Sequence, residues 1–486
     1  MVSGQARDHN YLRAIAMPLC RLSRRAWFCI ALTILLETSH AILTVPVISL
    51  YERVICDRYY AGQDPPQWPT GLDDRCKTPL IQAEVALVRG WQGFFNGLSA
   101  LLVALPMGYI TDHHSHRKAF AFILGGLIAA ILWTILVCAI PAVPIRLVWM
   151  TSLFYLCGGG NYAAEMMIGV MLVNSCSEAD RTRNLYYMYS AFIFTELVGP
   201  PFARWSASIA IWIPFAIGVI CLCACFPVLA IMPESTSLSA ASTASNQEVE
   251  SNDRVISIPN MHRRLSSILG LFNSWNMYWA LPMFFAGTFR NVSIRALLQY
   301  THVRLGWELV DTNALITEVA SVNLILFFFI LPTIITFVNG KYKPHPQSLN
   351  LGIIRISFGV LVGGSLLIAF SNSSAQLLVS LAIYACGFGA RATLLSLVTS
   401  WHDASVRARI YSAILLVELF GMLAWEPLLQ GILAISFALP RLWMGLPFLV
   451  CSIGYLCALT ASFLIRLQLK LPDQSSPRSA EAEEIL

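Results

Sequence analysis

The sequence predicts an all-α integral membrane protein with twelve transmembrane helices in two parallel-related six-helix halves. Three observations lead to this fold class: an apolar composition, a series of long apolar runs, and a motif that occurs twice. The 486 residues are 57% hydrophobic and 12% charged, whereas soluble domains carry about 25% charged residues. A chain of this composition cannot hide its apolar surface from water, which favours a bilayer.

Apolar runs of about twenty residues match a bilayer core about 30 Å thick. Twelve such runs are found at 26–51, 83–111, 119–140, 147–173, 185–203, 210–232, 274–300, 313–338, 351–371, 375–400, 408–435 and 442–466. A Ser-rich stretch between the sixth and seventh runs is typical of a disordered linker. The predicted divisions are a cytoplasmic tail (1–25), a six-helix half (26–232), the cytoplasmic linker (233–273), a second half (274–466) and a cytoplasmic tail (467–486).

Lys and Arg residues are shared unequally between the two sides that twelve crossings create. Nineteen lie on the side of the termini and eight on the other. Cytoplasmic loops retain positive charge, so both termini are predicted to be cytoplasmic. The net charge of +5 reflects this topology, and no basic cluster is dense enough to indicate nucleic-acid binding. The plasma membrane is the expected location, and a vacuolar or vesicle membrane would give the same topology.

One motif is written twice. YSAFIFTELVG at 189–199 matches YSAILLVELFG at 411–421, and YLCGGG at 155–160 matches YACGFG at 384–389. The fourth and fifth runs therefore correspond to the tenth and eleventh in the same order and direction. Two parallel six-helix halves are an architecture of secondary transporters, in which the substrate path lies between the halves.

Each copy of the repeat keeps a glutamate, Glu196 or Glu418, and Glu37 lies equally deep in the first run. About ten residues at 1.5 Å each place these carboxylates near the midplane, where a charge costs about 2.5–3.5 kcal/mol. A partner cation, a water-filled cavity or proton uptake would offset that cost. The candidate cations within apolar runs are Arg290, Arg295 and Arg391.

These six residues are the predicted transport or proton-coupling residues. For the repeated pair, Glu196 and Glu418, the alternative is a structural role in which a buried glutamate fixes helix packing. For Glu37 and Arg391 we favour a functional role, since each is the lone charge of its apolar run.

GYITDHHSHRK at 108–118 joins the second and third runs and holds Gly108, Asp112 and Arg117. An acid at a helix end that engages a cation or a helix N-terminus across the half interface would act as a conformational latch. An ordinary charged turn is the alternative. In the fifth run, Gly199-Pro200 predicts a helix break at the edge of a cavity.

Three residues on the predicted outer side suggest covalent modification. Cys56 and Cys76 lie on the oxidising side, where they could form a disulfide, but spacing alone does not show whether they meet. Asn372 begins a glycosylation sequon.

No ATP-binding loop, zinc-protease helix or nucleophile elbow occurs in the sequence. We therefore expect no cofactor, no metal site and no enzymatic activity, and any uphill transport would draw on an ion gradient.

These features resemble the major facilitator superfamily across nearly the whole chain. The loop at 108–118 is similar to the superfamily's loop motif, with Gly108, Asp112 and Arg117 at matching positions, Ser115 in place of a glycine and His116 in place of a basic residue. The Gly-Pro pair of the fifth run is similar to part of an antiporter signature. The resemblance implies a twelve-helix fold, alternating access and a gating role for the loop.

A narrower resemblance is to fungal facilitator transporters that are distantly similar to the proton-coupled folate transporter group. It is carried by the stretches 37–60, 158–160, 299–308 and 387–392 and by the sequence around Glu418. Such proteins often accompany secondary-metabolite biosynthetic genes, which implies export of a small organic product.

The expected function is therefore secondary active export of a small organic molecule or secondary metabolite in exchange for protons. We expect a monomer in the lipid bilayer, with Glu37 and Arg391 setting the electrostatics of the central cavity. Proton-coupled uptake is one alternative, and a non-transporting sensor of the same fold is another. A sensor would leave solute distribution unchanged in Glu37→Gln or Arg391→Ala.

Overall fold

The computed structural model describes residues 24–61, 74–113, 116–173, 178–232, 274–342, 345–401 and 404–466. The predicted linker, the predicted C-terminal tail and residues 1–23 lie outside these ranges. Within them the chain is helical, and no strand is present.

The first half follows the predicted apolar runs closely. Its helices are α2 (Arg24–Tyr59), α3 (Pro79–His113), α4 (His116–Ala139), α5 (Thr151–Leu156), α6 (Gly160–Val173), α7 (Glu178–Ile209) and α8 (Ile213–Ile231), with short 3-10 helices η2 (Asp74–Lys77) and η3 (Ile145–Met150). The helices α2 and α3 extend beyond their apolar runs, so that Cys56 lies within α2.

The second half also matches its runs. Its elements are α11 (Trp275–Gly287), α12 (Phe289–Leu305), η4 (Leu309–Thr312), α13 (Asn313–Ile325), the π-helical η5 (Leu326–Ile330), α14 (Leu331–Lys341), α15 (Pro346–Ala369), α16 (Ser374–Cys386), η6 (Gly387–Gly389), α17 (Ala390–Ser400), α18 (Ala404–Ser436), η7 (Arg441–Gly445) and α19 (Leu446–Leu464).

All twelve predicted runs are helical, and eight helical segments among the described residues are long and apolar enough to cross a membrane by length and composition. The other four runs correspond to α3, α5 with α6, α7, and α11 with α12. Two of these are interrupted, at 157–159 and at Thr288.

The repeated glycine motif interrupts its helix in both halves. In the first copy, Gly159 and Gly160 have φ values of 81° and 68°, a left-handed conformation that favours glycine. In the second copy, η6 forms a short 3-10 turn between α16 and α17. The repeat therefore places a bend at the same position of each half.

The predicted break at Gly199-Pro200 is wrong, because α7 continues through Pro200 and Pro201 to Ile209. Proline in a membrane helix is tolerated where neighbouring helices support it, and α2 packs along α7 here. A Cβ atom on Gly199 would lie 2.6 Å from Ala41 Cβ. The glycine therefore allows close packing of α2 on α7, and the helix does not need to end.

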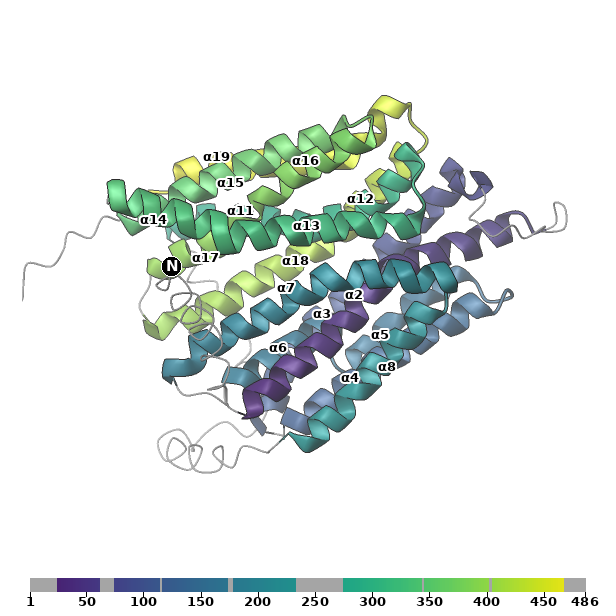
Figure 1. The fold of residues 1–486 in the computed structure, drawn as a ribbon, viewed down its shortest axis with the longest axis horizontal. Helices are drawn as coiled ribbons and strands as arrows, with labels where there is room; N and C mark the ends of the chain where they lie inside the picture. The colour runs from purple at the N-terminus through teal and green to yellow at the C-terminus, as the bar shows by residue number, and fades with distance from the viewer. Residues whose placement is uncertain are drawn as a thin grey trace, which may run out of the picture.

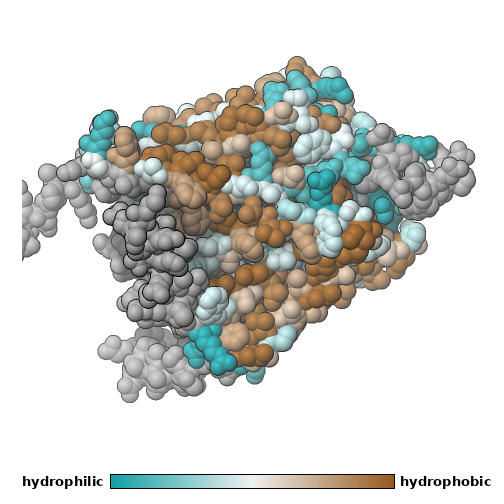
Figure 2. All heavy atoms as spheres, in the orientation of Figure 1, coloured by the Kyte–Doolittle hydropathy of each residue, from teal (hydrophilic) through white to brown (hydrophobic). Residues whose placement is uncertain are grey.

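The two halves lie side by side, with the purple-to-teal helices of the first half below the green-to-yellow helices of the second (Figure 1). The most extensive contacts between them are those of α3 with α18 and of α7 with α13. Figure 2 shows brown apolar side chains over much of the described lateral surface. Such a belt would be costly in water and suits lipid.

Candidate functional site

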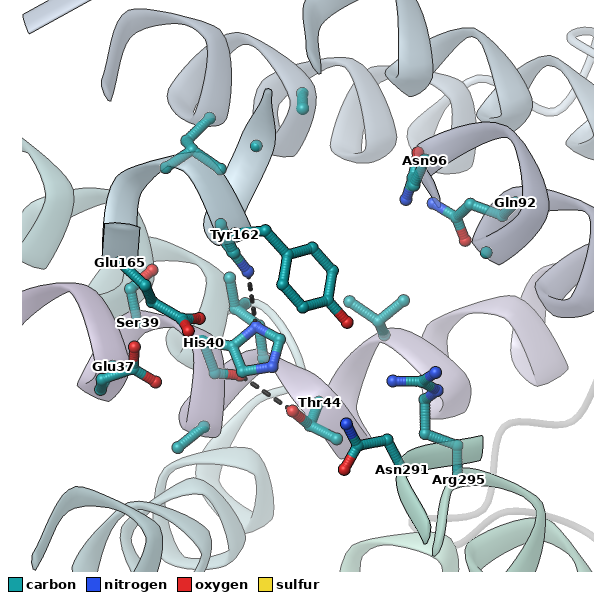
Figure 3. Close-up of a pocket in the computed structure, with 18 of the residues that line it drawn as sticks. Glu37, Ser39, His40, Thr44, Gln92, Asn96, Tyr162, Glu165, Asn291 and Arg295 are labelled. Atoms are coloured by element: carbon teal, nitrogen blue, oxygen red, sulfur yellow. Dashed lines mark hydrogen bonds between the residues drawn. The ribbon is translucent and has the colours of Figure 1, made fainter. Parts of the chain in front are cut away.

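A cavity of about 500 Å³ lies between the two halves. It is lined by residues of α2, α3, α6, α7, α12 and α18, so that both halves contribute. Figure 3 shows Glu37 and Glu165 at one side of this cavity and Asn291 and Arg295 at the other, with His40 and Tyr162 between them. The volume suits a small organic molecule.

Three carboxylates meet at the first side of the cavity. Glu37 on α2 has Glu165 on α6 and Glu196 on α7 as electrostatic neighbours, and all three line the cavity. Glu37 is 5% exposed. Among the described ion pairs, none includes these carboxylates. Glu37 and Glu196 line a polar cavity, which explains how these acids can lie inside apolar helices.

Neutral polar groups line the middle of the cavity. Asn161 Nδ2 lies 2.7 Å from His40 Nδ1, and because the amide nitrogen donates, Nδ1 accepts and the ring proton is on Nε2. Tyr51 donates to Gln92 Oε1 at 2.9 Å. These groups offer both donors and acceptors to a bound molecule.

Arginines occupy the other side. Arg295 Nε donates to Glu426 Oε1 at 3.1 Å, and its terminal nitrogen donates to Oε2. Arg89 donates to the Arg295 carbonyl at 3.3 Å. Arg290 lies 4.3 Å from the centre of the Phe388 ring, and its buried Nε has no hydrogen-bond partner. The first half therefore contributes three acids to the cavity and the second half contributes arginines, of which Arg290 is an electrostatic neighbour of Glu196.

Arg391 and Glu418 lie outside this cavity lining. They pair with each other through two hydrogen bonds, Nε to Oε1 at 2.5 Å and a terminal nitrogen to Oε2 at 2.7 Å. The two glutamates of the repeat thus differ: Glu196 faces the cavity, whereas Glu418 is neutralised by an arginine.

The loop motif is only partly described. The side-chain surroundings of Gly108 and Asp112 lie outside the described residues, so the latch stays a prediction. Arg117 Nε donates to the Leu229 carbonyl at 3.0 Å, and its terminal nitrogen donates to the Leu229 and Ala230 carbonyls. These contacts tie the start of α4 to the end of α8 within one half, at the helix terminus that favours a cation.

The outer residues are placed as follows. Cys56 and Cys76 are joined by a disulfide with a Cα–Cα distance of 5.4 Å. Asn372 is exposed between α15 and α16, and its side-chain oxygen accepts a hydrogen bond from Arg304 at 2.8 Å.

Sequence reasoning missed His40, Arg89, Glu165 and Glu426. The signal that singled out Glu37, an ionisable residue inside an apolar run, also applies to Arg89, Glu165 and Glu426. In the described residues, no group of three or more His, Cys, Asp or Glu is arranged to hold a metal ion.

Known proteins resemble this chain in sequence and in fold. The family model of the Major Facilitator Superfamily matches residues 86–425. "MFS efflux pump atnC" of Emericella nidulans is 26% identical over 463 residues, covering 93% of this chain and 89% of that protein. "Efflux pump ustT" of Aspergillus flavus is 24% identical over 403 residues, covering 80% of this chain and 78% of that protein.

Solved structures show the same fold at low identity. A POT family transporter in complex with 5-aminolevulinic acid has a TM-score of 0.60 at 14% identity, covering 91% of this chain and 97% of that one. The nucleoside transporter NupG has a TM-score of 0.58 at 13% identity, covering 91% of this chain and 100% of that one. The apolar helical bundle, the cavity between its halves and the family match lead to one conclusion: the chain belongs to the Major Facilitator Superfamily and is a multi-pass integral membrane transporter of small organic substrates, not an enzyme.

Proposed function

We propose that this protein exports a small organic molecule, of the kind produced by secondary metabolism, by alternating access and in exchange for protons. The observation that carries the proposal is the cluster of Glu37, Glu165 and Glu196 in the cavity between the halves. Like charges held close together cannot all stay ionised without cost. A cluster of this type takes up and releases protons as its surroundings change.

The cavity acids and the bound molecule would share one site. A substrate that enters between the acids and the arginines contacts Glu37 or Glu165 on the first half and Arg290 on the second. When the halves rock about the α3–α18 and α7–α13 contacts, the cavity opens to the opposite side. Protons that then bind the acids weaken their attraction for the substrate, which favours its release.

The direction of transport rests on the relatives. Two of them carry the name efflux pump, and the excess of Lys and Arg on the side of the termini supports cytoplasmic termini. The proposed location is therefore the plasma membrane. We propose the domain division given by the sequence, with cytoplasmic tails (1–25 and 467–486), a cytoplasmic linker (233–273) and two six-helix halves (26–232 and 274–466). The disulfide would then lie on the outer side, where oxidation is possible, and the Asn372 sequon would face the same side.

Protons move inward as substrate moves outward, and we propose that the monomer is sufficient for transport.

The test compares cells that express wild type, Glu37→Gln or no protein, with the medium and the cell extract both analysed by untargeted mass spectrometry. We expect at least one compound to be enriched in the medium and depleted in the cells only with wild type. Glu37→Gln keeps the shape of the side chain but cannot exchange a proton, so export should fall at least tenfold.

Glu84→Gln is the matched control, because Glu84 forms an exposed ion pair with Arg146 away from the cavity. It should export like wild type. Accumulation of the compound inside the cells would contradict export and indicate uptake. No difference from cells without the protein, despite its presence at the surface, would contradict transport.

A further inference from the structure

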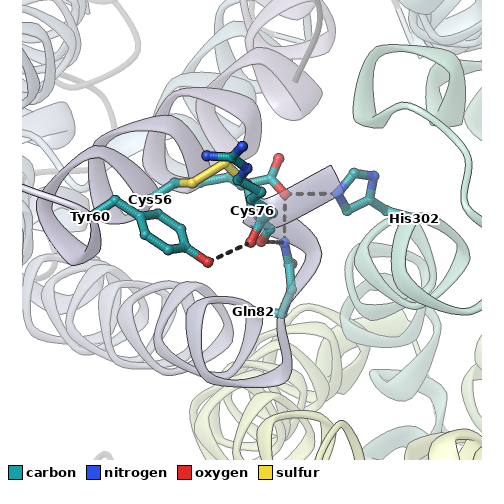
Figure 4. Close-up of a disulfide and its surroundings, with 7 residues drawn as sticks. Cys56, Tyr60, Cys76, Gln82 and His302 are labelled. Carbon is teal, nitrogen blue, oxygen red and sulfur yellow. Dashed lines mark hydrogen bonds and ion pairs between the residues drawn. A yellow bond between two sulfur atoms is a disulfide. The ribbon is translucent and has the colours of Figure 1, made fainter. Parts of the chain in front are cut away.

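A buried polar network joins the two halves at the end of the bundle that carries the Cys56–Cys76 disulfide, which we call the disulfide end. Glu52 on α2 and Gln82 on α3 belong to the first half, and Gln299 and His302 on α12 belong to the second. All four residues are 0% exposed. Figure 4 shows Gln82 and His302 converging beside the disulfide. The network bridges the two halves at this end.

The hydrogen bonds of the network cross the seam from α12 to α2 and α3 and continue within the first half. His302 Nε2 lies 2.7 Å from Glu52 Oε1, and Gln82 donates to the same oxygen at 2.5 Å and to the Cys76 carbonyl at 3.1 Å. Gln299 donates to the backbone oxygen of Gln82 at 2.6 Å and to its side-chain oxygen at 3.0 Å. Opening the halves at this end must break all the bonds that His302 and Gln299 make across the seam.

The number of protons follows from these contacts. His302 Nδ1 lies 2.5 Å from the Trp307 carbonyl oxygen, which is only an acceptor, so Nδ1 carries a hydrogen. Between Nε2 and Glu52 Oε1 there must be one further hydrogen, either on the ring or on the carboxyl group. In both arrangements the pair holds one more proton than a neutral imidazole beside a carboxylate.

Loss of that proton is costly while the seam is closed. It would leave the Nε2 lone pair facing a carboxylate, with one negative charge buried in a fully enclosed site. Glu52 Oε2 is also buried and has no hydrogen-bond partner, so Gln82 is the remaining donor to the carboxyl group among the described contacts. The closed seam therefore depends on the proton.

The charged groups on the surrounding elements have other described interactions. On α2, Arg53 interacts with Asp57. On η2, the Lys77 amine donates to the Gly306 carbonyl at 3.2 Å, and Arg75 has a further interaction besides the hydrogen bond that its backbone carbonyl accepts from Tyr60. On α3, Glu84 pairs with an arginine at the start of η3.

Charged groups of the second half, and Arg58 on α2, also lie on elements around Glu52 and His302. Arg304 on α12 donates to the Arg441 carbonyl, where η7 begins, and to a side-chain oxygen between α15 and α16. Asp311 on η4 pairs with Arg204 at 2.8 Å. Arg58 on α2 has buried guanidinium nitrogens without hydrogen-bond partners. Among the described ion pairs, the partner of Glu52 is His302.

We propose that Glu52 and His302 form a single-proton binding site across the seam, separate from the cavity acids, whose proton is held while the disulfide end is closed. When the halves part at this end, each side chain meets water by itself. An isolated imidazole loses its charge near neutral pH and an isolated carboxylic acid is ionised there. Opening therefore releases the proton, and acidity on this side of the membrane favours the closed gate.

The test measures amide hydrogen exchange of purified full-length protein in lipid nanodiscs, without substrate, between pH 6 and pH 8.5. After correction for the intrinsic pH dependence of exchange, peptides covering 45–59 and 289–305 report the opening of the seam. Linkage to one proton predicts that the open-to-closed ratio rises up to tenfold per pH unit. A seam whose protection is flat over this range would overturn the proposal.

Glu52→Gln is the decisive variant. With its amide nitrogen in the place of Glu52 Oε1, the glutamine can donate to His302 Nε2 without the extra proton, but it loses the bond that Gln82 makes to that atom. We therefore expect somewhat less protection than wild type at pH 6 and no pH dependence. A slope equal to that of wild type would assign the proton elsewhere and overturn the proposal.

Two further variants separate this site from the others. Glu84→Gln, at an exposed pair of the same end, and Glu37→Gln, in the cavity, should both keep the wild-type slope. Loss of the slope in Glu37→Gln would assign the proton linkage to the cavity and contradict the seam site. The measurement needs no transport, so it can fail or succeed independently of the proposed export.

Discussion

At the scale of residues, the two halves have kept the same glutamate but given it different surroundings. With the repeat offset that matches 155–160 to 384–389, Arg391 corresponds to Tyr162. In the second half that arginine neutralises Glu418. In the first half the same position is a tyrosine that lines the cavity, so Glu196 keeps an acidic group available to substrate and protons. One substitution between the copies separates a structural ion pair from a candidate transport residue.

The buried pair of Arg295 and Glu426 should matter for stability. The side chains are 32% and 6% exposed, respectively, and removing one partner of a buried pair leaves an uncompensated charge, which costs about 3–5 kcal/mol. Because a third of the arginine is exposed to the cavity, we expect the lower end of this range for Glu426→Gln. A thermal unfolding series in detergent, followed by tryptophan fluorescence, would show a clear fall in the midpoint.

The comparison for this prediction is Arg146→Gln, which breaks an exposed pair with side chains 64% and 31% exposed. Exposed pairs contribute about 0–1 kcal/mol, so its midpoint should stay close to that of wild type. Equal midpoints for the two variants would mean that the Arg295–Glu426 pair is as weakly coupled to folding as a surface pair.

The sequence indicated some of these residues and not others, for a physical reason. An acid in an apolar run is visible from hydropathy, which led to Glu37 and Glu196. Which cation neutralises which acid depends on how helices pack, both far apart in the chain, as α12 with α18, and consecutive, as α17 with α18. For this reason Arg391 was expected at the cavity, whereas the structure pairs it with Glu418.

At the scale of elements, the two halves approach each other closely where α3 packs on α18. Gly90 and Gly93 of α3 leave no room there for a side chain. A Cβ atom on Gly90 would lie 2.8 Å from Gln430 Cβ, and one on Gly93 would collide with Glu426 Cγ. Glu426 cannot move away freely, because Arg295 holds its carboxylate. The small residues of α3 therefore set how tightly the seam can close.

Gly93→Ala should hold the seam apart. Overpacking of this kind costs about 1–3 kcal/mol, which corresponds to about a 5- to 150-fold change in an equilibrium. We expect faster hydrogen exchange in 79–99 and at least a fivefold loss of export. Gly97→Ala is the matched control, since its Cβ would meet Leu423 Cδ1 at an ordinary 3.5 Å. If Gly93→Ala matched Gly97→Ala in hydrogen exchange and in export, the contact between Gly93 and Glu426 would not limit how closely α3 and α18 pack.

Most elements could be predicted because a bilayer demands long apolar helices, and all twelve runs are helical. Interruptions were harder. The expected break at Gly199-Pro200 did not occur, since packing against Ala41 supports α7 there. Thr288 separates α11 from α12, and Gly287 directly precedes it; a lone glycine in an apolar run is common, so this signal did not single out the interruption.

At the scale of the whole molecule, the cavity lies between two halves that are joined at the disulfide end. The repeat in the sequence predicted two corresponding halves, and the composition predicted their membrane setting. The state of the gate could not be predicted, because it depends on pairs such as Glu52 and His302, which are 250 residues apart. Both residues lie in stretches that carry the family resemblance, 37–60 and 299–308, but nothing in those stretches indicates that they meet, because their proximity arises only when α2 meets α12.

The central claim is that movement of the organic substrate is coupled to protons through the cavity acids. The most direct measurement uses purified protein in sealed vesicles with a pH-sensitive dye inside, to which the compound identified by mass spectrometry is added. The account predicts a substrate-dependent proton flux opposite in direction to the substrate, which is present in wild type and Glu84→Gln and at least tenfold smaller in Glu37→Gln. Substrate movement without any proton flux, or an unchanged flux in Glu37→Gln, would contradict it.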